Sequence, residues 1–255
     1  MCGRFVGFRS LEELKENFPI DKADCEVTAS YNVAPSQEIL AIINMTGENR
    51  LDKFHWGLVP FWAKDISIGN RMINARSETI AEKPSFRNAF KKRRCLILAD
   101  GFYEWKGEKG HKQPMFITLP NRKPFAFAGL WETWHKKSDT ASPYKSCTII
   151  TTQASQTFSE IHHRMPVILK SEFYKSWLDP QNHDLDALKS ILKNEILTEL
   201  VSCPVSKQVN SASYNNPSCI GPISDITSHL DGRQKQRLHS LLNVKNEDAI
   251  LRMRE

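Results

Sequence analysis

Residues 95–105 read CLILADGFYEW, and the middle of the chain is organised around this stretch. The apolar run CLILA, stopped by Asp100-Gly101, is typical of a buried strand that ends in a turn. Further stretches of β-forming residues follow at 114–119, 124–134 and 146–153. The sequence therefore predicts a β-rich middle. Glu104, flanked by aromatic residues just beyond a buried strand, is a candidate for acid/base chemistry.

Helices are predicted on both sides of this β-rich middle. The motif SLEE at residues 10–13 is a capping box, so residues 10–18 are expected to form a short amphipathic helix. Residues 85–90 look helical and lead into KKRR at 91–94, the strongest basic run, which is typical of a solvated helix end. Core helices are also expected at 171–178 and 184–200, and an edge strand at 204–210.

Composition limits the class of protein. The 255 residues are 40% hydrophobic and 25% charged, which is typical of a globular chain, and the net charge of +6 favours a polyanionic partner. Six cysteines contain no CxxC pair, so neither a zinc ribbon nor a disulfide scaffold is indicated. The N-terminus lacks a signal-peptide core and no apolar run approaches ~18 residues, so we expect an intracellular protein without a membrane segment.

Cys2 directly follows the initiator methionine, so removal of Met1 creates an N-terminal 1,2-aminothiol. Its amine can form an imine with an aldehyde, and its thiol can then close a five-membered thiazolidine ring. The α-amine titrates near ~7.7–8.0, against ~10.4 for lysine, which favours imine formation at neutral pH. The alternative is that Cys2 is simply a small buried residue at a chain end.

Two other stretches carry candidate functional side chains. The segment HWGLVPFW at 55–62 suits a rigid irregular loop. Its aromatic rings either belong to the core or form a surface on which bases stack, and such stacking contributes ~1–3 kcal/mol of binding free energy per base. Residues 73–79 are polar at alternating positions, so on a strand the side chains of Asn74, Arg76 and Glu78 share one face. This polar face is either part of a functional site or simply exposed to solvent.

A histidine pair, His162-His163, precedes a short apolar segment at 167–169 that is expected to be a strand. Metal binding needs a third ligand at a known spacing, and the sequence offers none. Acid/base or hydrogen-bonding work by one of these histidines is the favoured interpretation.

Six motifs, taken together and in order, closely resemble those of the SRAP family of abasic-site processing proteins. The match runs from residue 2 to about residue 222. It implies an α+β, β-rich single domain over residues 2–222, in which curved antiparallel and mixed sheets form a barrel-like core with peripheral helices. A charged helical extension is expected at 223–255. The motifs are CGRF at 2–5, YNVAP at 31–35, WGLVP at 56–60, NARSET at 74–79, ADGFYEW at 99–105 and IHHRMP at 161–166.

The resemblance also implies a function, namely binding of single-stranded DNA and formation of a thiazolidine crosslink between Cys2 and the ring-opened aldehyde of an abasic site. It implies roles for Asn74 near the amine and the sugar, for Glu104 as acid/base and for His162 as proton carrier. No metal or cofactor is implied. The implied DNA contacts are Arg4, Arg76 and Arg164 on phosphates, Thr151 and Asn210 along the DNA channel, and Phe61 and Trp62 as a wedge beside the lesion.

The expected partner is single-stranded DNA that contains abasic sites, at replication forks or single-strand/double-strand junctions, bound by a monomer during the DNA damage (SOS) response. Such an enzyme crosslinks itself, and AP-lyase and autopeptidase activities are associated expectations. In a bacterium it is expected in the cytoplasm with the nucleoid, and in a eukaryote in the nucleus. Two other hypotheses stay open: a cysteine peptidase with an N-terminal nucleophile, and a noncovalent binder of single-stranded DNA.

Overall fold

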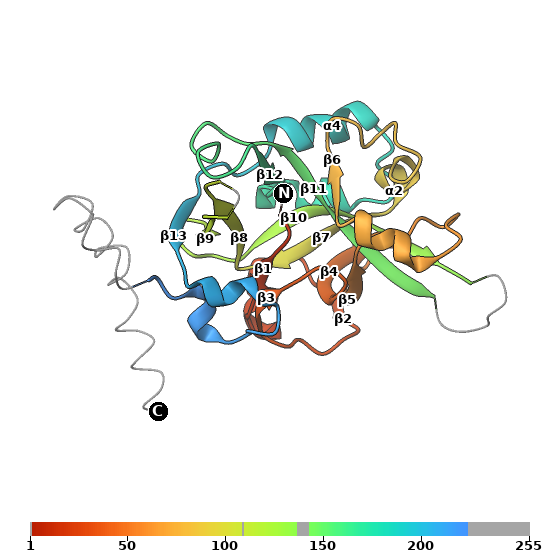
Figure 1. The fold of residues 1–255 in the computed structure, drawn as a ribbon. Helices are drawn as coiled ribbons and strands as arrows, with labels where there is room; N and C mark the ends of the chain where they lie inside the picture. Colours follow the sequence, from red (N-terminus) through yellow and green to blue (C-terminus); the bar gives the residue numbers. More distant parts are fainter. Residues whose placement is uncertain (1, 109, 137–142, 224–255) are drawn as a thin grey trace. The chain divides into compact units, whose positions relative to one another are not determined.

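The computed structural model describes residues 2–108, 110–136 and 143–223, and the elements discussed all lie in the compact unit that ends at Gly221 (Figure 1). The extension expected at 223–255 lies, from residue 224 on, outside the described residues. The strands are β1 (Phe5–Gly7), β2 (Lys22–Ala23), β3 (Ser30–Val33), β4 (Glu38–Asn44), β5 (Asn49–Trp56), β6 (Asn74–Arg76), β7 (Arg94–Ala99), β8 (Gly101–Lys106), β9 (Gln113–Thr118), β10 (Phe125–Trp134), β11 (Tyr144–Gln153), β12 (Arg164–Pro166) and β13 (Val201–Pro204). The helices are α1 (Leu11–Asn17), α2 (Arg87–Lys92), α3 (Tyr174–Leu178) and α4 (Leu185–Asn194), with 3-10 turns η1 (Ile66–Arg71), η2 (Ser171–Phe173), η3 (Lys207–Asn210) and η4 (Pro217–Ile220).

The larger sheet closes on itself. Its eight strands run in the order β12-β11-β10-β7-β4-β5-β2, with β6 added beside β11. A parallel pairing of Ser146 with His55 and of Cys147 with Trp56 joins β11 to β5. Strands β11, β10, β7, β4 and β5 therefore form a ring without a free edge, and the predicted barrel-like core is confirmed. A second sheet of five strands has the order β13-β9-β8-β1-β3.

Strand β7 is buried along its whole length because it faces two separate hydrophobic clusters. Leu96 and Leu98 pack in one cluster with residues of α1, α3 and α4. Cys95, Ile97 and Ala99 pack in the other, which also contains Cys2 and lies against the five-stranded sheet. A strand with two apolar faces has no polar alternation, which explains the continuous run CLILA and confirms the buried strand.

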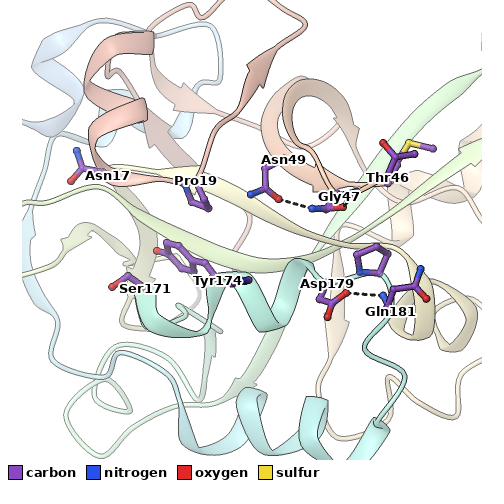
Figure 2. Close-up of a pocket in the computed structure, with 13 residues that line it drawn as sticks. Asn17, Pro19, Thr46, Gly47, Asn49, Ser171, Tyr174, Asp179 and Gln181 are labelled. Carbon is purple, nitrogen blue, oxygen red and sulfur yellow. Dashed lines mark hydrogen bonds between the residues drawn. The ribbon is translucent and has the colours of Figure 1, made fainter.

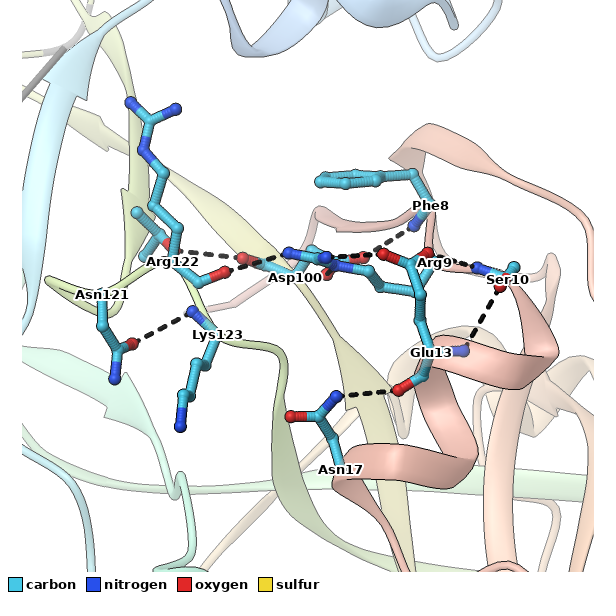
Figure 3. A network of polar contacts seen from close by, with 10 residues as sticks. Phe8, Arg9, Ser10, Glu13, Asn17, Asp100, Asn121, Arg122 and Lys123 are labelled. Carbon is cyan, nitrogen blue, oxygen red and sulfur yellow. Dashed lines mark hydrogen bonds and ion pairs between the residues drawn. The ribbon is translucent and has the colours of Figure 1, made fainter. Parts of the chain in front are cut away.

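The chain start is tied to the turn between β7 and β8 by the polar network in Figure 3. Asp100 accepts from the Phe8 backbone N–H at 2.7 Å and from Arg9 Nε at 2.9 Å, and Arg9 also donates to Glu13 at 2.8 Å. Burial raises the pKa of the Asp100 carboxyl, and these hydrogen bonds only partly offset the shift. The network fixes the segment that follows Cys2 against the β7–β8 turn.

Helix α1 confirms the predicted capping box, because the Ser10 hydroxyl accepts from the Glu13 backbone N–H and the Glu13 side chain accepts from the Ser10 backbone N–H.

Three other predictions of secondary structure need correction. Helix α4 ends at Asn194 rather than near residue 200, since Leu197 hydrogen bonds back to Ile168. The expected edge strand at 204–210 is a 3-10 turn from Lys207 onward, and residues 167–169 make only isolated bridges.

The basic run at 91–94 divides into two environments. Lys91 and Lys92 are exposed at the end of α2, whereas Arg94 is 3% exposed and begins β7. Its guanidinium donates to backbone carbonyls of α2 and of the segment after α3, and burial lowers its pKa to about 10. Among the residues that the structure describes, no carboxylate pairs with Arg94, so its role is to hold these backbone segments together, and the expectation of a solvated charge is wrong for this residue. The carbonyls belong to Phe90, Lys91, Trp177, Asp179 and Asn182.

We predict that Arg94→Met lowers the free energy of unfolding by about 3 kcal/mol, because it leaves buried carbonyls without donors. Urea denaturation measures the effect. Arg87→Met, at an exposed position of α2, is the matched control and should stay within about 0.5 kcal/mol of the parent protein. An equal free energy of unfolding for the two variants would contradict this structural role of Arg94.

Candidate active site

Cys2 lies in a fully buried position at the N-terminal end of β1. Its carbonyl accepts a 2.8 Å hydrogen bond from Asn74 Nδ2 on β6. Burial raises the pKa of the Cys2 thiol, and the negative charge of Glu104 raises it further. The thiol is therefore protonated at neutral pH, and the effect of Glu104 shows that this carboxyl group lies near it.

Glu104 and His162 form the second pair of the site. Glu104 stands on β8, is 6% exposed and lies 3.9 Å from His162 Nε2. His162 Nδ1 lies 3.0 Å from both the backbone N–H and the backbone carbonyl oxygen of Arg164, so either tautomer of the ring finds a hydrogen-bond partner there while Nε2 faces Glu104. Burial lowers the pKa of His162, although Glu104 opposes the shift. A neutral imidazole that faces a carboxyl group can carry a proton in either direction.

Asn74 has one unused polar atom. Its Nδ2 holds the Cys2 carbonyl, while its Oδ1 is buried and has no hydrogen-bond partner in the described part of the chain. A buried acceptor without a donor is costly and is rare away from functional positions. The four residues predicted as catalytic thus come from the segment before β1, from β6, from β8 and from the segment before β12.

Arg4 belongs to a second cluster. Its Nη1 donates to Asn32 Oδ1 at 2.7 Å and to the Val209 carbonyl at 2.8 Å, and its guanidinium lies over the Trp105 ring at 5.9 Å. Trp105 Nε1 in turn donates to Asn210 Oδ1 at 2.7 Å. The structure therefore brings the predicted DNA contacts Arg4 and Asn210 to one tryptophan, which is next to Glu104 in sequence: Arg4 lies over its ring and Asn210 accepts from its indole N–H.

Asn32 is a site residue that the sequence interpretation missed. It is 1% exposed, and its Nδ2 donates to the carbonyls of Val209, Ser211 and Tyr214 while its Oδ1 holds Arg4. The available signal was an asparagine inside the otherwise apolar motif YNVAP. A polar residue buried on a strand needs several partners, and here those partners are the segment that carries Asn210.

Arg164 lies in a third cluster, with Thr151. It donates to Glu78 at 2.6 and 3.1 Å and to the Thr151 carbonyl and hydroxyl at 2.7 and 3.1 Å. Burial raises the pKa of Glu78, but the hydrogen bond from Arg164, a backbone hydrogen bond and the positive charges of Arg164 and Arg76 together outweigh it, so the pKa is lowered. Thr151 is fully buried, so in this structure it supports Arg164.

Arg76 is the exposed arginine of this region. It ends β6, which pairs with β11 so that Arg76 lies opposite Thr151. The strand expected over 73–79 stops here, and the following turn lets Glu78 reach Arg164 instead of sharing a strand face with Asn74. Of the three arginines predicted to hold phosphate, Arg164 is the one with an ion pair among the described residues, Arg4 binds neutral oxygen atoms, and Arg76 is the exposed one.

Phe61 and Trp62 are 54% and 48% exposed on the loop between β5 and β6. Their loop is anchored at its base, because a Cβ on Gly57, whose φ is +140°, would lie 2.6 Å from the Gly69 carbonyl oxygen. Trp56, by contrast, is 1% exposed and donates to the Ile73 carbonyl, next to Asn74. The question left open for the aromatic stretch is therefore resolved: Trp56 is core, and the other two rings face solvent.

A pocket of about 760 Å³ lies away from all of these clusters, between α1, the β4–β5 turn and α3 (Figure 2). Its turns satisfy their own polar groups: Gly47 N–H donates to Asn44, and Gln181 N–H donates to Asp179. None of the predicted site residues lines it. Within the described ranges, no group of three His, Cys, Asp or Glu side chains could hold a metal ion, and no helix is long and apolar enough to cross a membrane.

The fold and the site define a class: a closed β-barrel protein with a buried cysteine at position 2 beside a carboxyl–imidazole pair and an asparagine. Residues 1–212 match the family model of the SOS response associated peptidase (SRAP), and the chain belongs to this family. The resemblance inferred from the six motifs is therefore confirmed.

Relatives span bacteria and vertebrates. The chain is 48% identical over 223 residues to the abasic site processing protein YoqW of Bacillus subtilis, covering 86% of this chain and 99% of that one. It is 32% identical to the abasic site processing protein HMCES of Xenopus tropicalis, over 76% of this chain and 66% of that one. A crystal structure of a Bacteroides thetaiotaomicron protein superposes with a TM-score of 0.74 at 25% identity, over 87% of this chain and all of the other.

We predict that Glu104→Gln accelerates alkylation of Cys2 by iodoacetamide at pH 8 roughly three- to tenfold, because removal of the carboxylate charge lowers the thiol pKa. Peptide mass spectrometry follows Cys2 separately, and the fully buried Cys147 serves as an internal reference. Glu108→Gln, at an exposed position, is the matched control and should leave the rate unchanged. A Cys2 rate that is the same in both variants would show that Glu104 does not act on the thiol.

Proposed function

We propose that this protein processes abasic sites in single-stranded DNA by forming a thiazolidine between Cys2 and the ring-opened sugar. The observation that carries the proposal is the convergence of Cys2, Asn74, Glu104 and His162, with an unpartnered acceptor on Asn74 beside Cys2. The names of the relatives, which are abasic site processing proteins, support the same lesion as the substrate.

The first step is imine formation. After Met1 is removed, the Cys2 amine attacks the C1′ aldehyde, and a carbinolamine loses water to give the imine. Expulsion of that water needs a proton, and Glu104, with His162 at 3.9 Å, can take it as a carboxylate from the nitrogen of the tetrahedral adduct and deliver it to the leaving hydroxyl group. The free Oδ1 of Asn74 can accept from the amine or from a sugar hydroxyl and so orient the nucleophile.

The second step is ring closure. The thiol sulfur bonds to the imine carbon, and the thiol proton is transferred through Glu104 to the imine nitrogen, which becomes the ring N–H. The raised pKa of the thiol, due to burial and then to Glu104, means that this proton must be removed during closure. The product keeps the sugar in a buried ring, where strand cleavage and further reactions of the aldehyde are suppressed.

The DNA strand is held by charge and stacking. We propose that Arg76 contacts phosphate directly, that Arg4 and Arg164 contribute from their clusters with Asn32 and with Glu78, and that Asn210 lines the channel while the buried Thr151 holds Arg164 in place behind it. Phe61 and Trp62 act as the wedge beside the lesion. Phosphate contacts of this kind position a strand without reading its sequence. The partner is then abasic single-stranded DNA at forks or junctions, bound by a monomer with residues 2–222 as the DNA-binding domain.

The decisive experiment mixes the protein with an abasic single-stranded oligonucleotide. The parent protein should give a heat-stable crosslink at pH 6–8, and Cys2→Ala should give only an imine that borohydride traps, because it retains an amine but cannot close the ring. Denaturing gels and intact mass report both species. The Cys147→Ala variant controls for loss of a buried thiol and should still crosslink. Absence of any crosslink with the parent protein would favour a peptidase or a noncovalent binder, and a heat-stable adduct with Cys2→Ala would rule out the thiazolidine at Cys2.

A separate prediction concerns the free amine. One residue added before Cys2 in a protein that keeps it should abolish both the stable adduct and the trapped imine, because the α-amine is then part of a peptide bond. Mass spectrometry of the intact protein verifies the terminus before the assay. Full activity of the extended protein would rule out the amine as the nucleophile.

A further inference from the structure

His163 is a titratable side chain that the proposed reaction does not use. Adjacent residues of an extended strand point to opposite faces, but the chain bends at His163, just before β12. The imidazole rings of His162 and His163 lie on the same side and stack, with centroids 4.3 Å apart and planes inclined by 27°. His163 is exposed, whereas the His162 side chain is only 17% exposed. One face of the His162 ring is thus covered by a second imidazole that is in contact with solvent.

The backbone on either side of the stack is anchored. The Ala154 backbone N–H donates to the His163 carbonyl at 3.1 Å, and the His162 backbone N–H donates to the Phe158 carbonyl at 3.2 Å. The Phe158 side chain is 3% exposed. His162 Nδ1 is held within 3.0 Å of the Arg164 backbone N–H and carbonyl oxygen. The two rings are therefore carried by a fixed segment of the chain.

Several groups act on the charge of His162. Burial lowers its pKa, Glu104 on β8 and the hydrogen bond with the Arg164 backbone raise it, and the positive charges of the amino terminus and of His163 lower it again. The net direction is downward, which favours the neutral ring. The other charged side chains near this segment are paired with each other, Arg164 with Glu78 at 2.6 Å and Lys106 with Glu160 at 3.8 Å.

Two stacked imidazole rings resist carrying two positive charges. At the observed separation of 4.3 Å, the repulsion separates their titrations by about 0.5–1 pH unit even when water screens it. As the pH falls, the first proton binds to the exposed ring, because burial disfavours the charged form of the other ring. The charge of His163 then opposes protonation of His162.

We propose that His163 is a positioning residue for the reaction: its ring orients His162 toward Glu104, and its positive charge in mild acid keeps His162 neutral. The inference rests on the proposed function for the role of His162 as proton carrier. A neutral His162 can accept a proton from Glu104 and return it, whereas a ring that is already protonated can only donate. The stacked pair therefore extends the reaction to pH values at which a lone histidine in this position is charged.

The first test is an NMR titration of the free protein, in which the imidazole signals are followed from pH 4.5 to pH 8. His163→Phe keeps a stacking ring but removes the charge, so we expect the titration midpoint of His162 to rise by about 0.5–1 pH unit. His163→Gln removes both the ring and the charge and should raise the midpoint as well. His183→Phe, at an exposed position before α4, is the matched control and should leave the His162 midpoint unchanged.

The second test is the rate of crosslinking to an abasic single-stranded oligonucleotide over pH 5–8, measured relative to the parent protein at each pH. His163→Phe should react at nearly the parent rate at pH 8 and several times more slowly near pH 5.5, because His162 is then protonated. His163→Gln should be slower at every pH, since its His162 ring also loses the stacking partner. The control His183→Phe should follow the parent profile.

Two outcomes overturn the proposal. A His162 midpoint that stays constant or falls in both His163 variants would show that the charge of His163 does not act on His162. A parent-like rate of His163→Gln at pH 8 would show that the stack does not orient the ring. If the parent protein forms no crosslink, the proposed reaction fails, while the titration, which needs no DNA, still decides whether His163 controls the charge of His162.

Discussion

The pairing of β1 with β8 is the constraint on which the site depends. Phe5 lies opposite Phe102, and the Tyr103 backbone N–H donates to the Arg4 carbonyl at 2.9 Å. Continued in the same antiparallel register, this pairing carries Cys2 toward Glu104, about one hundred residues further along the chain. The hydrogen bonds from Phe8 and Arg9 to Asp100 hold the other end of β1. The segment that carries Cys2 therefore cannot shift along β8 without breaking these hydrogen bonds.

Local signals predicted much of this architecture. The capping box of α1 and the apolar run of β7 depend on neighbours in sequence, and both were found where the sequence placed them. Closure of the barrel was inferred only through the family resemblance, because the parallel pairing of β5 with β11 joins segments about ninety residues apart and leaves no local pattern. Arg94 shows the same limit, since the run KKRR does not reveal which of its charges is buried under five carbonyls.

The functional clusters show which part of a site a sequence can indicate. Residue type indicated Cys2, Glu104 and one histidine of the pair as chemically capable, the family resemblance added Asn74 and selected His162, and the structure brings the four together. Residue type did not distinguish exposed Arg76 from Arg164, which is paired with Glu78 and backed by buried Thr151. Whether an arginine is available to bind phosphate depends on its neighbours in space. Glu78 can pair with Arg164 because β6 ends two residues before Glu78, at Arg76.

Burial of the Cys2 thiol has two effects that act together in the proposed reaction. A thiol whose pKa is raised by burial and by Glu104 is a poor nucleophile toward general electrophiles, so it is protected from oxidation and alkylation before DNA binds. The amine reacts first in this scheme, and the resulting imine carbon is held next to the sulfur. Proximity then replaces thiolate character as the source of reactivity, with Glu104 positioned to take the proton. The same carboxyl group that keeps the thiol inactive is thus the base that releases it once the aldehyde is bound.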